Sequence, residues 1–225
     1  MFLNTELWLR ALLAIAIGFA VSFASTPIVK TFAQKVGAMD VPKDARRVHD
    51  HPIPRMGGLA IFVSVIATIA MFSPAILFTR TVPYVIGAIS LMALLGFADD
   101  ALNLKPNRKL FVMIVGATLV YIAGIRIWSL YGFFGIHELP PFVSYLVTVF
   151  TIIVIINAYN LIDGIDGLAS SVTFVVMAFF TVAGVLWSAY GIQALFPAAM
   201  AGGLAAFFVY NHHPAKVFMG DTGSL

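Results

Sequence analysis

PFVSYLVTVFTIIVII, residues 141–156, leads directly into NAYNLIDGIDGLA, residues 157–169. The first stretch has no charged side chain, which is typical of a membrane helix, since about 20 apolar residues cross the hydrocarbon core. The second stretch sets four polar side chains at intervals of three: Asn157, Asn160, Asp163 and Asp166. This pair of stretches predicts a membrane-crossing helix that leads into a polar site.

The composition of the whole chain points the same way. The 225 residues are 61% hydrophobic and 10% charged, against about 45–50% and about 25% in a typical soluble domain. No water-soluble fold of this size could cover so much apolar surface, so lipid must be the solvent for most of the chain. Because helices satisfy their own backbone hydrogen bonds in lipid, we predict an all-α, polytopic integral membrane protein forming one transmembrane domain over residues 1–225.

Seven apolar stretches are predicted to cross the membrane. They cover residues 7–29, 57–79, 83–98, 110–125, 141–156, 168–187 and 192–210. The third, fourth and fifth are short, so their ends are expected to extend beyond the apolar run. We interpret the first as a retained helix and not a signal peptide, because Lys30 and Lys35 follow it.

The positive charges assign an orientation to these spans. One set of loops carries ten cations: Lys30, Lys35, Lys43, Arg46, Arg47, Arg55, Lys105, Arg108, Lys109 and Lys216. The opposite set carries Arg10, Arg80 and Arg126. Cytoplasmic loops are enriched in Lys and Arg, so the N-terminus is predicted outside. The same parity places every aspartate in the cytoplasm: Asp40, Asp44, Asp50, Asp99, Asp100, Asp163, Asp166 and Asp221.

Charge and cysteine content exclude several functions. The net charge of +3 is small, and no stretch interleaves clustered cations with exposed aromatic residues, so nucleic acid is not an expected partner. The absence of cysteine from the sequence excludes disulfides, thiol nucleophiles and thiolate metal sites. A metal would therefore need oxygen or imidazole ligands.

Two predicted cytoplasmic segments combine cations with carboxylates. Residues 40–58, DVPKDARRVHDHPIPRMGG, end in a glycine pair that permits close approach of a ligand or helix, and Arg55 suits a phosphate. The alternative is a solvated basic loop. Residues 96–109, GFADDALNLKPNRK, hold Asp99 and Asp100, which point about 100° apart on a helix. We expect one to accept a proton and the other to hold a cation or its water shell; the alternative is an interfacial stop signal.

The stretch 157–169 gives the sharpest signal. If it is helical, Asn160, Asp163 and Asp166 share one face, which suits a cation or a nucleoside. A calcium EF-hand loop is excluded because its closing Glu is missing. The signature of a CDP-alcohol phosphotransferase also requires Ala-Arg shortly after the first Asp-Gly, and this sequence lacks it.

The final segment, NHHPAKVFMGDTGSL, covers residues 211–225. Glycines on both sides of Asp221 leave its carboxylate open as a ligand for Mg²⁺, which prefers oxygen. His212 and His213 could be ligands too, but we interpret them as residues that cap a helix end.

In this order the motifs resemble one family. PRMGG, DD, NAYNLIDGIDGLA and PAKVFMGDTGSL closely resemble the polyprenyl-phosphate N-acetylhexosamine-1-phosphate transferases, over about residues 40–225. That family includes bacterial undecaprenyl-phosphate N-acetylglucosamine-1-phosphate transferases and the phospho-N-acetylmuramoyl-pentapeptide transferase. Arg55 and the Asn-x-x-Pro-Ala-Lys sequence before the last motif resemble the N-acetylglucosamine branch.

The resemblance implies a role for each matching residue. The expected catalytic residues are Asp99 and Asp100, the first as the base that acts on the lipid phosphate. Asn160 and Asp221 are expected to hold Mg²⁺, with Mn²⁺ as the alternative ion. The expected substrate-binding residues are Arg55, Lys109, Asn157, Asp163, Asp166 and Lys216. Lys109 would contact the donor diphosphate, and the two aspartates belong to the nucleotide-binding segment.

The implied reaction moves N-acetylglucosamine 1-phosphate from UDP-N-acetylglucosamine to undecaprenyl phosphate and releases UMP, as the first membrane step of cell-envelope polysaccharide synthesis at the bacterial inner membrane. The partners would be the UDP-sugar, the polyprenyl phosphate and membrane lipids, and a homodimer is left open, as is the choice between direct attack and an aspartyl intermediate. Alternatives are a phospho-N-acetylmuramoyl-pentapeptide transferase, a transporter, or a non-catalytic lipid-phosphate-binding protein. A transporter fits less well, because carriers place ionisable residues near mid-membrane.

The sequence departs from the family pattern at two places. Asn107 stands where relatives often carry a lysine, and the sequence ends inside the last motif, where an eighth helix is expected to begin. Relatives continue with further spans and a His-x-His-like loop that helps bind the donor. We therefore expect the chain to represent the N-terminal two-thirds of such a protein and to have little or no transferase activity alone.

Overall fold

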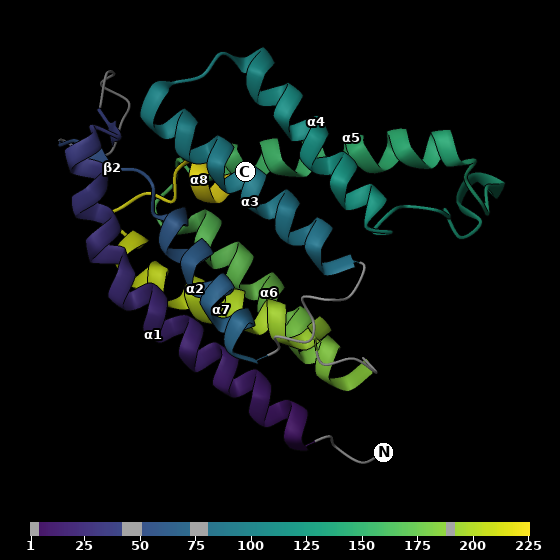
Figure 1. The fold of residues 1–225 in the computed structure, drawn as a ribbon, viewed down its shortest axis with the longest axis horizontal. Coiled ribbons are helices and arrows are strands. Elements are labelled where there is room, and N and C mark those ends of the chain that lie inside the picture. The colour runs from purple at the N-terminus through teal and green to yellow at the C-terminus, as the bar shows by residue number, and fades with distance from the viewer. Residues whose placement is uncertain (1–4, 42–50, 73–80, 188–191) are drawn as a thin grey trace.

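The computed structural model of the chain describes residues 5–41, 51–72, 81–187 and 192–225 (Figure 1). Within these ranges nearly all regular structure is helical. The elements are α1 (Thr5–Val36), β1 (Met39–Asp40), β2 (Ile53–Pro54), α2 (Gly58–Phe72), α3 (Thr81–Leu102), α4 (Pro106–Ile122), the short 3₁₀ turn η2 (Phe133–Gly135), α5 (Pro141–Ile162), α6 (Leu168–Trp187), α7 (Ile192–Asn211) and α8 (Asp221–Ser224). The predicted all-α fold is confirmed.

The helices are those of a polytopic membrane protein. Five are long and apolar enough to cross a bilayer: α1, α3, α5, α6 and the part of α7 from Ala194 to Asn211. Helix α2 is apolar but has 15 residues, and α4 has 17. The second predicted span continues into residues 73–80, which lie outside the described residues. The remaining predicted spans each correspond to one helix.

Three helices continue past the ends of their apolar runs. Helix α1 continues past residue 29 to Val36, α3 past residue 98 to Leu102, and α5 past residue 156 to Ile162; the extension of α3 and α5 was expected. In α3, polar side chains do not end the helix, because they find partners without leaving helical geometry. Asp100, for example, is only 2% exposed and is held by backbone of another segment.

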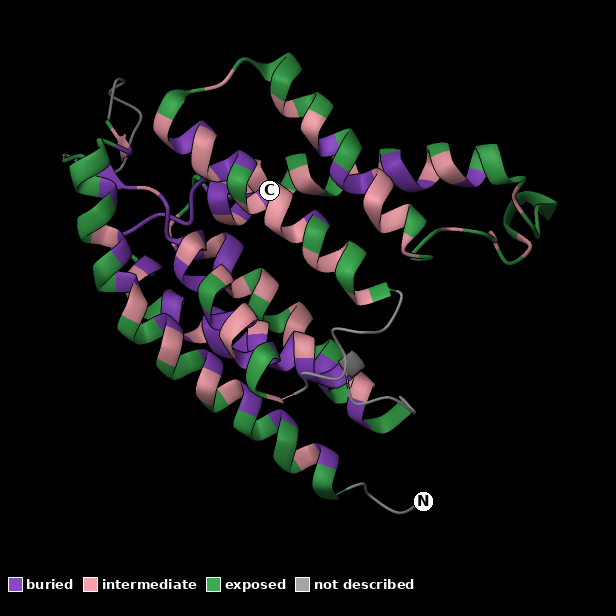
Figure 2. Ribbon diagram, in the orientation of Figure 1, coloured by how far each residue is buried: buried purple, intermediate pink, exposed green. Residues whose placement is uncertain are grey.

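Small residues let the central helices pack closely. A Cβ atom added at Gly202 of α7 would lie 2.1 Å from the carbonyl oxygen of Ile15, and one at Gly18 of α1 would lie 2.5 Å from the carbonyl oxygen of Ala199. Such glycines allow helix backbones to approach each other in a membrane, where packing takes the place of the hydrophobic effect. Buried residues therefore concentrate where α7 meets α1 (Figure 2).

The segments that carry the polar motifs lie together at one end of the helix bundle. Figure 1 shows β2, α8 and the adjoining end of α3 on the side opposite the N-terminus. This is the end predicted to face the cytoplasm. Of the charges used for that prediction, Lys43, Asp44, Arg46, Arg47, Asp50 and Arg80 lie outside the described residues.

Candidate active site

The loop before α8 is held against the segment Pro54–Gly58 by backbone hydrogen bonds. The amide of Gly57 donates to the carbonyl of Phe218 (3.0 Å), that of Gly58 to Met219 (2.8 Å), and that of Phe218 to Pro54 (2.9 Å). A Cβ atom at Gly58 would lie 2.2 Å from the Cα atom of Gly223. The expectation that this glycine pair permits close approach is confirmed, and what approaches is the backbone of the last motif.

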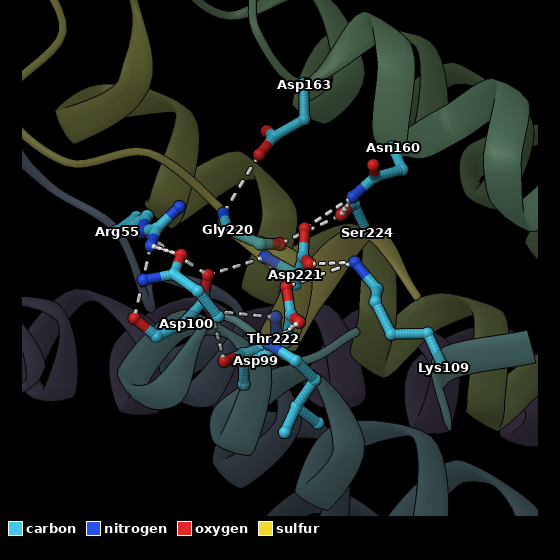
Figure 3. Close-up of polar contacts among 12 residues, drawn as sticks. Arg55, Asp99, Asp100, Lys109, Asn160, Asp163, Gly220, Asp221, Thr222 and Ser224 are labelled. Atoms are coloured by element: carbon cyan, nitrogen blue, oxygen red, sulfur yellow. Dashed lines mark hydrogen bonds and ion pairs between the residues drawn. The ribbon is translucent and has the colours of Figure 1, made fainter. Parts of the chain in front are cut away.

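Asp100 organises the start of α8. Its Oδ1 accepts a hydrogen bond from the backbone amide of Asp221 (3.1 Å), and its Oδ2 accepts from the amide (3.0 Å) and hydroxyl (2.7 Å) of Thr222 (Figure 3). The Nε atom of Arg55 lies 3.9 Å from Oδ1, and its Nη2 donates to Oδ1 of Asn103 at 2.9 Å. Both oxygens of this buried carboxylate are therefore engaged by the protein.

Asp99 faces a different set of groups. Its Oδ1 accepts a hydrogen bond from the amide of Leu104 (2.8 Å), and its Oδ2 accepts from Nζ of Lys109 (3.1 Å). Lys109 also donates to Oδ2 of Asp221. One ammonium group thus bridges the carboxylates of Asp99 and Asp221. The two adjacent aspartates point to different partners, as their position on a helix predicts.

Asp221 is the meeting point of three elements. Besides Lys109 of α4, the amide nitrogen of Asn160 in α5 donates to its Oδ1 and to Oγ of Ser224, at 2.5 Å and 2.9 Å. Burial acts to raise the pKa of Asp221, but hydrogen bonds with Asp99, Lys109 and Asn160 and the charge of Lys109 outweigh it and lower that pKa. A carboxylate that stays ionised is what a cation ligand requires.

Asp163 lies just beyond the end of α5 and holds the other side of the loop. Its Oδ2 accepts a hydrogen bond from the amide of Gly220 at 2.9 Å, while its Oδ1 is buried without a hydrogen-bond partner among the described residues. Burial raises the pKa of Asp163 to about 7, and the nearby charges of Asp100 and Asp221 add to the rise, against the Gly220 bond that lowers it. Asp163 and Asp100 thus hold three successive residues, Gly220 to Thr222.

Asp166 does not belong to this cluster. Helix α5 ends at Ile162, and the chain turns through Gly167, whose φ is +71°. The predicted common face of Asn160, Asp163 and Asp166 is therefore wrong. The Oδ2 atom of Asp166 instead accepts from the amide of Ala215 (3.1 Å) and lies 2.9 Å from Nδ1 of His213.

A recess of about 340 Å³ lies beside Asp166. It is lined by Ile165, Asp166, Gly167, Leu168, Ser171, Phe208, His212 and His213. Both histidines follow the end of α7, as their interpretation as end caps requires, but His213 also contacts the carboxylate of Asp166.

Besides Asp166, two predicted site residues lie apart from the cluster. The side-chain amide of Asn157 donates to the carbonyl of Ile153 in its own helix (2.8 Å), and Lys216 is exposed. Neither side chain contacts the cluster in the part of the chain that the structure describes. Their role in substrate binding stays a prediction.

Sequence reasoning missed three residues that shape the site. Thr222 bonds Asp100, and Ser224 accepts from Asn160 and donates to the carbonyl of Gly220. A Cβ atom at Gly96 would lie 2.2 Å from the carbonyl oxygen of Asp221, so only glycine lets α3 approach α8 this closely. The hydroxyls in GDTGS and a glycine one turn before the paired aspartates were the available signals.

The residues around Lys109 fit a magnesium ion in their chemistry. The carboxylates of Asp99 and Asp221 and the hydroxyl of Ser224 offer oxygen atoms, and the ammonium of Lys109 already lies between the two carboxylates. Asn160 presents its amide nitrogen to Asp221 and Ser224, so its amide group would have to rotate to offer its oxygen. Among residues 5–41, 51–72, 81–187 and 192–225, no three His, Asp or Glu side chains form a metal site by themselves. Mg²⁺ is commonly bound in this way, by one or two carboxylates together with substrate phosphates.

Comparison with known proteins identifies the family. Residues 82–225, which include Asp99, Lys109, Asn160 and Asp221, match the family model described as glycosyl transferase family 4. The chain belongs to this family. The relationship predicted from the motifs is thereby confirmed.

The relatives of this chain are named either as N-acetylglucosamine 1-phosphate transferases or as phospho-N-acetylmuramoyl-pentapeptide-transferases. A probable undecaprenyl-phosphate N-acetylglucosaminyl 1-phosphate transferase from Bacillus subtilis is 36% identical over 98% of the chain and 61% of its own length. A phospho-N-acetylmuramoyl-pentapeptide-transferase from Thermoanaerobacter sp. is 33% identical over 96% of the chain and 72% of its own length. A decaprenyl-phosphate N-acetylglucosaminephosphotransferase from Mycolicibacterium smegmatis is 33% identical, with 91% and 54% covered. The chain thus spans between about half and three quarters of these relatives.

Proposed function

We propose that the full-length protein transfers N-acetylglucosamine 1-phosphate from UDP-N-acetylglucosamine to undecaprenyl phosphate, releasing UMP, with Mg²⁺ bound at Asp221. The observation that carries the proposal is the convergence of Asp99, Lys109, Asn160 and Asp221, from four separate elements, around one cationic position. Phosphoryl transfer depends mainly on alignment and neutralisation of charge, and such a cluster supplies both.

Each residue of the cluster has a distinct task in this proposal. Asp221 and Asn160, with Asp99 and Ser224 beside them, would hold the ion, which neutralises charge on the donor diphosphate when bound. Lys109, already between two carboxylates, supplies a further positive charge for the phosphates. Asp99 accepts any proton on the lipid phosphate as its oxygen attacks the sugar-bearing phosphorus. The bond from that phosphorus to the UMP oxygen then breaks, and UMP leaves.

Asp100 has a positioning task in this proposal instead of a chemical one. Its two oxygens accept three hydrogen bonds from Asp221 and Thr222, and its side chain is 1% exposed, so a substrate proton has little access to it. It fixes the backbone that aims the Asp221 carboxylate. Asp163 does the same through Gly220.

The nucleoside and the choice of sugar rest on fewer contacts. We assign the uracil ring to the recess beside Asp166, whose carboxylate borders it together with His213 and Phe208. N-acetylglucosamine is preferred over the muramoyl-pentapeptide because Arg55, in the N-acetylglucosamine branch pattern, lies against Asp100 and Asn103 at the edge of the cluster. The active site is proposed to face the cytoplasm of a bacterium, following the charge distribution of the loops.

The test is UMP release by the purified full-length protein from UDP-N-acetylglucosamine, with undecaprenyl phosphate and Mg²⁺. Asp221→Ala is expected to abolish release, while Glu6→Gln, at the far end of α1, leaves it unchanged. Supplying UDP-N-acetylmuramoyl-pentapeptide in place of the first donor tests the sugar. Release that persists in Asp221→Ala, or without undecaprenyl phosphate, would refute the proposed reaction.

A further inference from the structure

The connection between α4 and α5, residues 124–140, exposes an unusual set of aromatic side chains. Tyr131 is 81% exposed and Phe134 is 86% exposed, the two highest values among the exposed large hydrophobic residues of the described chain. Trp128 and Phe133 are exposed as well, and the ring pairs Trp128–Tyr131 and Phe133–Phe134 lie 6.0 Å and 4.3 Å apart. We refer to residues 124–140 as the aromatic hairpin.

The backbone of the hairpin is strained in a way that displays these rings. Tyr131 and Phe134 adopt positive φ angles of 51° and 53°, and each is followed by a glycine that also has a positive φ. Left-handed geometry is unfavourable for a residue with a side chain. Strain of this kind persists where the surrounding structure and a function require it. Two of the four described non-glycine residues with positive φ lie in this one turn.

Most backbone amides in the turn of the hairpin are satisfied from within. The amides of Leu130, Gly132, Phe133, Gly135 and Ile136 all donate to carbonyl oxygens inside the hairpin, and the amide of Tyr131 donates to the hydroxyl of Ser129. The base of the hairpin is fixed to α5, where Thr148 accepts from the amide of Ile127 and Ser144 donates to its carbonyl. Such a turn can leave water at little cost, because few backbone groups lose a hydrogen bond.

The position of the hairpin matches the edge of a bilayer. Helix α5 leads from it to Asn160 at the polar cluster, and its 22 residues correspond to a length of about 33 Å at 1.5 Å per residue. The hydrocarbon core measures about 30 Å. The hairpin thus lies one membrane thickness away from the cluster, at the outer tip of α4 and α5 (Figure 1).

We propose that the aromatic hairpin inserts Tyr131, Phe134 and their neighbours into the lipid headgroup region of the leaflet opposite the polar cluster. The exposed apolar surface is continuous with the lipid-facing ends of the flanking helices, where Ile122 and Phe142 are exposed. Trp and Tyr rings concentrate at this depth in membrane proteins because one part of each ring system is apolar and another is polar. The hairpin thereby fixes the outer ends of α4 and α5, whose inner ends carry Lys109 and Asn160.

Site-directed spin labelling of the full-length protein in phosphatidylcholine and phosphatidylglycerol liposomes tests this proposal. In a background without other cysteines, Phe134→Cys is labelled and compared with Phe150→Cys on the exposed face of α5 and with Asn107→Cys at the start of α4. The ratio of collisions with oxygen to collisions with a water-soluble nickel chelate is expected to be severalfold higher at position 134 than at 107, and lower than at 150. A ratio equal to that at 107 would place the hairpin in water and overturn the proposal. Protection from both reagents would place it against protein and overturn it equally.

The fluorescence of native Trp128 gives a second measurement, made first with Tyr131 and Phe134 in place. With Trp8, Trp187 and any other tryptophan of the full-length protein replaced by Phe, fluorescence is expected to be quenched more by lipids brominated near the acyl carbonyl than by lipids brominated near the chain end. Quenching by neither lipid would contradict the insertion. Replacing both Tyr131 and Phe134 with Ser is expected to reduce the quenching.

Discussion

The polar cluster has two parts, an inner half around Asp100 and Asp163 and an outer half around Asp99 and Asp221. Aspartate serves a different purpose in each half. In the inner half, Asp100 and Asp163 are buried and accept hydrogen bonds from the backbone of Gly220, Asp221 and Thr222. In the outer half, Asp99 and Asp221 share the ammonium of Lys109. Aspartates that are adjacent in a motif can therefore differ in what they hold: Asp100 holds the loop before α8, whereas Asp99 binds the ammonium of Lys109.

The largest effect is expected from removing the charge of Asp99. Asp99→Asn keeps an acceptor for the amide of Leu104 but can no longer take a proton or attract a cation, so kcat is expected to fall about 10²- to 10⁴-fold, as for other general bases. The melting temperature should stay within the range of Glu6→Gln, because the loop before α8 is untouched. UMP release and thermal unfolding in detergent measure the two quantities. A melting temperature clearly below that of Glu6→Gln would show that Asp99 holds the fold, as Asp100 and Asp163 do, and would contradict this prediction.

A smaller but opposite pattern is expected for Asp100. Asp100→Asn turns an amide group toward backbone amides that need an acceptor, and a hydrogen bond to a charged group contributes about 1.5–3 kcal/mol. The free energy of unfolding is expected to fall by about that amount. Activity should fall because less protein is folded and because the Asp221 carboxylate is less well oriented. The pH dependence of the remaining activity should be unchanged. A normal melting temperature with an altered pH profile would assign Asp100 to the chemistry instead.

The smallest effect is expected from Asp163 and concerns pH. Because burial raises its pKa in the folded state to about 7 from 3.8, its protonated form stabilises the fold below pH 4, and this contribution is lost as the pH rises through about 7. Asp163→Asn keeps an acceptor for Gly220 and cannot ionise. Relative to wild type, its melting temperature is expected to rise by about 2–4 °C per kcal/mol regained as the pH increases from 4 to 8. A difference that is constant over this range would contradict the assignment.

The sequence predicted the parts of the structure that depend on composition and local motif. The apolar runs located the helices, and the charge distribution gathered the aspartates at one end, because both follow from the cost of polar groups in lipid. The ends of the helices were harder to predict. Helices α3 and α5 continue through Asp100 and Asn160 because residues 220–224 supply hydrogen-bond partners for these side chains. Those partners are 60 or more residues away, so local sequence does not reveal them.

Two other features depended on backbone geometry that the sequence did not specify. The stripe of three expected for Asn160, Asp163 and Asp166 fails because α5 ends at Ile162, which sends Asp166 toward Ala215. The aromatic hairpin was predicted only as an external connection. Its exposed rings depend on positive φ angles at Tyr131 and Phe134, which neither residue type favours.

Binding of one divalent ion at Asn160 and Asp221 is tested most directly by electron paramagnetic resonance of Mn²⁺ added to the full-length protein with UDP-N-acetylglucosamine, with Glu6→Gln as the matched control. One bound ion per chain is expected in wild type and control, and loss of that ion is expected in Asp221→Asn. Undiminished binding of Mn²⁺ by Asp221→Asn would contradict this expectation.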